Sequence, residues 1–117
     1  MSFSIVLSQS FTTPVVVRIA NDKGAVDESK FTATFKRLPI PELDAMALVR
    51  GDGAPGRSSF IVDEVRRVLI DWSGINGAEG ALPFTAENVE MVLLIPQAVR
   101  ALHAAFWLDA YGAREKN

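Results

Sequence analysis

The period of the hydrophobic pattern changes near residue 38, and no other feature of this sequence constrains the fold as strongly. Before that point, apolar residues recur at every second position, in residues 15–19 and again in residues 31–35. Such alternation, rich in Val and Phe, is typical of β-strands. The polar segment between the two runs, from Asn21 to Ser29, is predicted to be a loop that is too long for a two-residue turn. The sequence therefore predicts an antiparallel hairpin with a flexible tip, to which residues 5–7 add a short third strand.

After Leu38 the period becomes 3.6, which is typical of amphipathic helices. Pro41 suits the first position of a helix, and the run of breakers at residues 51–56 ends it. A second helix, capped by Ser58 or Ser59, is predicted from a stripe of apolar residues at helical spacing. That stripe comprises Ile61, Val65, Val68, Leu69 and Trp72, so this helix is expected to continue to residue 72.

Two more helices follow a glycine-rich loop at residues 73–80. Thr85 is the expected N-cap of the third helix, and Pro96 ends it because proline disfavours helical geometry at the preceding residue. The fourth helix is predicted from Pro96 to Tyr111. The expected fold class is α+β: one domain over residues 1–117, with a β-rich part at 1–38 and a helical part at 39–117 whose roughly four helices pack on one face of the hairpin or small sheet.

Composition excludes several functional classes. The chain has 12 basic and 14 acidic residues, a net charge of −2, and no basic cluster, so nucleic-acid binding is not expected. It has no cysteine, which excludes disulfides and thiolate metal sites. No apolar run reaches the roughly 18 residues of a membrane span. We expect a protein that stays in the cytoplasm.

The sequence offers little for catalysis or cofactor binding. Gly51, Gly53 and Gly56 have dinucleotide-binding spacing, with Asp71 twenty residues after the first glycine. That motif requires a preceding strand, whereas a helix is predicted there. His103 is the single histidine and lacks partners for a usual zinc site. We therefore predict no enzyme activity and no cofactor, with a small nucleotide-binding module as a minor alternative.

The last helix carries the candidate binding residues. Its apolar face is complete without two large aromatic side chains, Trp107 and Tyr111, which share the opposite face with Arg100 and Arg114. Exposed aromatic and arginine side chains are what interface hot spots are made of. The alternative is that this helix is central in the fold, is buried on both sides and places Trp107 in a satellite cluster.

Two further motifs carry a resemblance to a known family. One is Trp72-Ser73-Gly74, at the end of the second predicted helix. The other is Leu82-Pro83-Phe84-Thr85, where Phe84 and Val89 are expected to staple the start of the third helix. From about Phe31 onward, their order and setting resemble those of small tail assembly chaperones of long-tailed bacteriophages and prophages.

The resemblance implies a protein that binds the phage tape measure protein, the tail tube protein or both, transiently and often as an oligomer. An exposed edge of the N-terminal sheet is a route to such self-association. Two alternatives remain open: a structural tail component, such as a completion or connector subunit, and a protein-interaction domain unrelated to phage.

Overall fold

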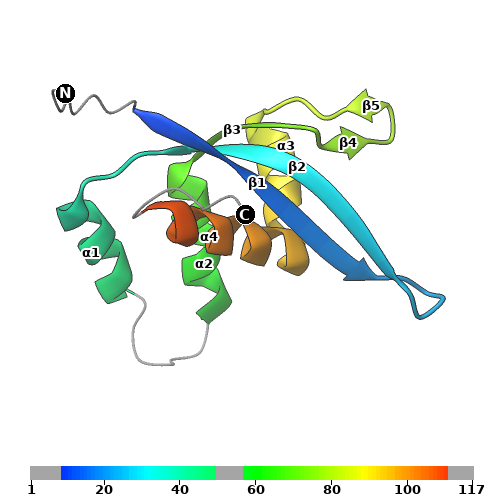
Figure 1. Cartoon of the computed structure of the whole chain (residues 1–117), viewed down its shortest axis with the longest axis horizontal. Helices are drawn as coiled ribbons and strands as arrows, with labels where there is room; N and C mark the ends of the chain where they lie inside the picture. Colours follow the sequence, from blue (N-terminus) through cyan, green and yellow to red (C-terminus); the bar gives the residue numbers. More distant parts are fainter. Residues whose placement is uncertain (1–8, 50–56, 111–117) are drawn as a thin grey trace, which may run out of the picture.

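The computed structural model describes residues 9–49 and 57–110, and its first two strands form a long antiparallel hairpin (Figure 1). Strand β1 spans Ser10–Ala20 and β2 spans Val26–Lys36. Phe11 is paired with Phe35 and Val15 with Phe31, so the predicted strand pair is confirmed. The predicted loop to Ser29 was wrong, because the ladder with β1 continues through these polar residues to Val26. The expected strand at residues 5–7 lies outside the described residues.

Each hairpin strand has one apolar and one polar face. Thr13, Val15 and Val17 on β1 are buried, and so are the alternate residues Phe31, Ala33 and Phe35 on β2. The other face carries hydroxyl side chains, and the Oγ1 atoms of Thr12 and Thr34 lie 3.1 Å apart in a cross-strand hydrogen bond. A period of two thus gives the sheet one face for the core and one for water.

A third strand completes the sheet, but it comes from a segment predicted to be helical. Helix α2 ends at Val68 (Arg57–Val68), and strand β3 (Leu69–Ser73) pairs with β2 antiparallel. Phe35 is opposite Leu69 and Thr34 is opposite Asp71, which leaves Ile70 as the extra residue of a β-bulge. The bulge brings both Leu69 and Trp72 to the core side although they are three residues apart. The prediction that α2 continues to Trp72 was wrong because a bulged strand and a helix use the same apolar spacing here.

The four helices are otherwise close to expectation, and the α+β fold class is confirmed. Helix α1 spans Ile40–Val49, α3 spans Ala86–Leu93 and α4 spans Pro96–Ala110. The loop after β3 contains a minor hairpin of β4 (Asn76–Gly77) and β5 (Gly80–Ala81). The described element before residues 51–56 is helix α1, the one after them is helix α2, and β3 is antiparallel to its neighbour. A dinucleotide fingerprint needs a strand before the glycines within a parallel βαβ unit, so the glycine spacing has no such setting.

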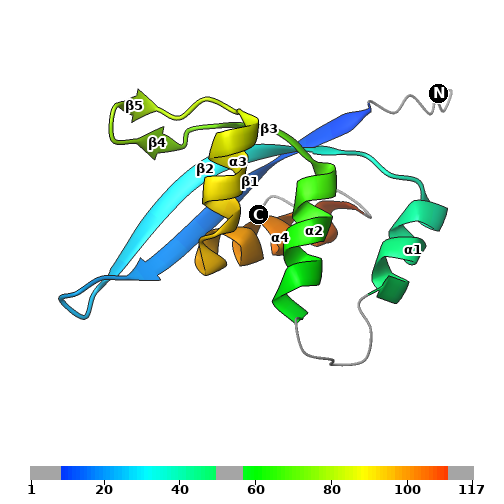
Figure 2. The same ribbon diagram turned by 180° about the vertical axis from the view of Figure 1, so that it is seen from behind.

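Helix α4 lies between the sheet and α2, as the two opposite views show (Figures 1 and 2). On its sheet side, Phe106 contacts both hairpin strands, with its ring centroid 5.9 Å from that of Phe11 and 5.4 Å from that of Phe35. Buried apolar residues from β1, β2, β3 and all four helices form one continuous cluster around these rings. Residues on both sides of position 38 thus share this core.

We expect Phe35→Ala to lower the free energy of unfolding by about 3–5 kcal/mol, because Phe35 is fully buried and its removal leaves a cavity beside the rings of Phe11 and Phe106. Urea denaturation monitored by circular dichroism measures this change. Leu108→Ala is the control: Leu108 is 61% exposed, and the expected change is within about 0.5 kcal/mol. Similar effects of the two substitutions would contradict the assigned core.

Candidate protein-binding surface

Trp107, the leading candidate from the sequence, is turned toward α2. Its indole Nε1 donates a hydrogen bond of 2.9 Å to Oε1 of Glu64, and its ring packs edge-on against Phe106, with centroids 5.3 Å apart. The side chain is half-buried and belongs to the edge of the core. The structure thus matches the alternative considered above, in which α4 is covered on both sides.

The same oxygen of Glu64 also bonds to His103, one turn earlier on α4. The His103 Nε2 and Glu64 Oε1 atoms are 2.7 Å apart. Glu64 is only 6% exposed, and a carboxylate so far from water requires polar partners. One buried carboxylate on α2 therefore fixes two consecutive turns of α4, which is a structural role for both His103 and Trp107.

Of the other three predicted binding residues, the structure describes Arg100. Arg100 is exposed, and no other side chain in the described ranges forms an ion pair with it. Tyr111 and Arg114 lie outside the described residues. Of the two predicted residues that the structure describes, Trp107 is half-buried, and Arg100 is exposed and forms no ion pair with another described residue.

The residues of the two family-like motifs mainly organise the chain around β3. Trp72 is buried, its Nε1 donates to the Leu82 carbonyl at 2.8 Å, and its ring lies edge-on to Phe84 with centroids 4.9 Å apart. Gly74 turns the chain at φ +89°, and Phe31 lies directly beside it. The Asn88 side chain bonds to the Pro83 carbonyl. These contacts close the loop from β3 to α3.

Thr85 is the N-cap of α3, as predicted. Its side chain accepts a hydrogen bond of 3.1 Å from the backbone N–H of Asn88, which satisfies one of the free donors of the first turn. Phe84 stands one residue before the cap, as a hydrophobic staple requires, and packs on Trp72. The cap and this packing fix where α3 starts and which way it runs.

The most exposed apolar side chains near one another lie where α3 passes into α4, the yellow-to-orange bend of Figures 1 and 2. The two helices are bent by 101° across a connection of two residues, Leu94 and Ile95. Leu94 is 81% exposed, Ile95 is 39% exposed, and Met91 on the preceding turn of α3 is 52% exposed. We call Met91, Leu94 and Ile95 the α3–α4 corner.

A groove lies on each side of the α3–α4 corner. The sheet-side groove has a volume of about 350 Å³, reaches Ile95 and runs to the hairpin at Val17, Ile19 and Lys30. The helix-side groove, of about 200 Å³, includes Leu94 and has walls from α2, α3 and α4. Its lining residues are Ile61, Val62, Leu93, Leu94, Pro96, Val99 and Arg100. Leu94 and Ile95, which are adjacent in the chain, thus line different grooves on the two sides of the α3–α4 corner.

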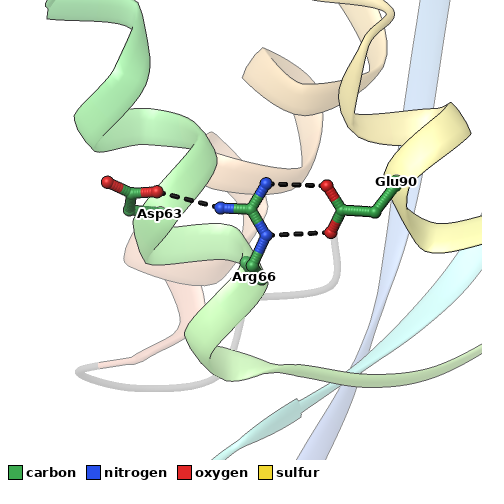
Figure 3. A network of polar contacts seen from close by, with 3 residues as sticks. All are labelled: Asp63, Arg66 and Glu90. Atoms are coloured by element: carbon green, nitrogen blue, oxygen red, sulfur yellow. Dashed lines mark hydrogen bonds and ion pairs between the residues drawn. The ribbon is translucent and has the colours of Figure 1, made fainter. Parts of the chain in front are cut away.

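Arg66 on α2 forms ion pairs with Asp63 on the same helix and with Glu90 on α3 (Figure 3). Arg66 on α2 donates from Nε and Nη2 to the two carboxylate oxygens of Glu90 on α3, both at 2.8 Å, and from Nη1 to Asp63 at 2.9 Å. The hydrogen bonds from Arg66 hold the pKa of Glu90 below its ordinary value, and those to Glu90 raise the pKa of Arg66. The bidentate Arg66–Glu90 pair helps to set how α3 packs against α2, and therefore the direction in which the chain enters the α3–α4 corner.

Two other kinds of site were considered. Among residues 9–49 and 57–110, no group of three or more His, Asp or Glu side chains is placed to hold a metal ion. In the same ranges no single helix is both long and apolar enough to cross a membrane, and only the bent α3–α4 pair meets the length and composition test.

No protein-family model, curated protein or solved structure matches this chain. Support for a function therefore comes from the surface just described and from the sequence motifs.

Glu90→Gln is expected to lower the urea midpoint at neutral pH, because it removes the charge that pairs with Arg66. The pKa of Glu90 is depressed in the folded state, so its stabilisation is present above the ordinary pKa of 4.5 and is lost as the pH falls through the folded-state value. The difference in urea midpoint between Glu90→Gln and the unsubstituted protein should therefore become smaller at acid pH. Glu79→Gln, in the β4–β5 turn, is the control for loss of one negative charge. A difference independent of pH would contradict this role for Glu90.

Trp107→Phe removes a hydrogen bond to a buried carboxylate and should lower the free energy of unfolding by about 1.5–3 kcal/mol. Urea titration of the variant and the unsubstituted protein measures this loss. A change within about 0.5 kcal/mol, as expected for an ordinary surface substitution, would argue against the role of Trp107 in fixing α4.

Proposed function

We propose that this chain is a protein-binding domain and that the α3–α4 corner is the centre of its binding surface. One observation carries the proposal: Met91, Leu94 and Ile95 are exposed side by side, between two grooves. Isolated exposed apolar residues are ordinary on protein surfaces, whereas a contiguous patch beside grooves is typical of interaction sites. Methionine suits such a site because its flexible side chain adapts to different partners.

Trp107 is less suited to be the anchor of this surface. Its indole N–H already bonds to Glu64, and its ring contributes to packing between α4 and the core. A partner that extracted this side chain would have to replace a hydrogen bond to a buried carboxylate, which is energetically costly. Arg100, in contrast, lines the helix-side groove and is exposed.

We further propose that the domain acts as a tail assembly chaperone of a bacteriophage or prophage in the host cytoplasm. The support is the resemblance carried by the Trp72–Gly74 and Leu82–Thr85 motifs, together with an apolar surface fitted to bind another chain. A long helical client such as the tape measure protein exposes apolar stripes before assembly, and a reversible binder would shield them. The tail tube protein is the second proposed client. Binding alone suffices for this task, without catalysis or a cofactor.

Co-expression of the chain with the phage tape measure protein and the tail tube protein tests the proposal. We expect a complex that keeps the tape measure protein soluble. Leu94→Asp should reduce co-purification at least about tenfold, because it places a charge in the centre of an apolar contact. Leu108→Asp is the matched control, since Leu108 is also an exposed leucine, but on α4 away from the α3–α4 corner.

Two results would overturn parts of the proposal. Equal co-purification by the two folded variants would show that the α3–α4 corner is not the binding surface. Presence of the chain in purified virions at the stoichiometry of a tail protein would instead identify it as a structural component, because a chaperone leaves before the particle is complete.

A further inference from the structure

The walls of the helix-side groove come from three helices and from Leu94 in the connection between α3 and α4. Ile61 and Val62 come from α2, Leu93 from α3, and Val99 and Arg100 from the first turns of α4. A peptide that binds by β-strand addition needs the edge of a sheet, and no strand residue lines this groove. Side chains spaced three and four residues apart, as Pro96, Val99 and Arg100 are, form the ridges against which another helix packs.

The size of this groove fits a protein side chain better than a small molecule. Its volume of about 200 Å³ is below the roughly 300–1,000 Å³ of typical small-molecule sites. Six of its seven lining residues are apolar, and Leu94, the most exposed of them, forms its rim. A leucine or similar residue of a partner helix would fill such a space while the rest of that helix covers Leu94.

The charge at this groove specifies the partner further. Arg100 is the groove's charged residue, and within the described ranges no carboxylate forms an ion pair with it. The neighbouring Arg66 differs, because Asp63 and Glu90 already neutralise it. Covering Arg100 with a purely apolar surface would remove its water without replacing the lost hydrogen bonds, so a carboxylate in the partner is favoured.

We propose that the helix-side groove binds an amphipathic helix of the client that carries an Asp or Glu beside its apolar stripe, with that carboxylate paired to Arg100. This inference rests on the proposed protein-binding function and adds the chemistry of the bound segment. It assigns affinity to apolar burial at Leu94 and selectivity to the charge of Arg100.

Two fluorescent synthetic peptides test it. Both are amphipathic helices with the same leucine stripe at helical spacing, flanked by glutamates in one and by lysines in the other. In anisotropy titrations of the full chain, we expect the glutamate peptide to bind about tenfold more tightly, because attraction to Arg100 is replaced by repulsion in the lysine peptide. Arg100→Glu should reverse the preference. Lys23→Glu, the same change of charge in the hairpin turn, should leave it intact.

The possible outcomes separate this inference from the proposed function. A preference for glutamate that Arg100→Glu reverses and Leu94→Asp abolishes supports the inference. Equal binding of both peptides, or binding of neither, overturns it even if co-purification of the client depends on Leu94. Conversely, if the tape measure and tail tube proteins do not co-purify with the chain, a preference for the glutamate peptide that depends on Arg100 would still support the inference. Sedimentation of the chain alone tests another occupant: a dimer that Leu94→Asp dissociates would mean that a second copy covers the groove, and would also overturn the inference.

Discussion

The placement of α4 between the sheet and α2 is the constraint on which the other packing relations depend. Its two sides are held by different physics. Toward the sheet, Phe106 packs against the rings of Phe11 and Phe35, which also contact each other, and burial of apolar area supplies the free energy. Toward α2, His103 and Trp107 bond to one oxygen of Glu64. The apolar contact is tolerant of small rotations, whereas the hydrogen bonds are directional, so together they set both the depth and the orientation of α4.

The exposed surface is a consequence of that placement. Because α4 is held and α3 is capped at Thr85 and tied to α2 through Glu90, the two residues that connect α3 and α4 have to span a bend of 101°. Leu94 and Ile95 are exposed at this bend, although Val92, Leu93 and Val99 beside them are buried. Exposed apolar side chains carried by packed neighbours need little further ordering to bind another surface.

Local rules predicted much of the fold. Alternation over residues 15–19 and 31–35 depends only on which side chains fit a one-sided sheet, and the hairpin has the predicted faces. The bounds of α3 and α4 follow from Thr85 and Pro96, whose effects are confined to one helical turn. The sequence did not predict β3 because the helical spacing of apolar residues continues across the boundary between α2 and β3, at Val65, Val68, Leu69 and Trp72. The bulge at Ile70 allows a strand to bury residues at the same spacing. Only pairing with β2, a contact between residues distant in sequence, distinguishes the two.

The same distinction applies to the candidate surface. The sequence by itself determined that α4 carries two kinds of face and that Arg100 lies on the polar one, because the helical period is a local property. The tertiary structure alone decided that the polar face meets Glu64, which turned Trp107 from a candidate contact into a packing residue. It also decided that the exposed apolar residues gather at the α3–α4 corner, since exposure depends on the angle between two helices. That angle is set by contacts with α2 and the sheet, and these join residues far apart in the chain.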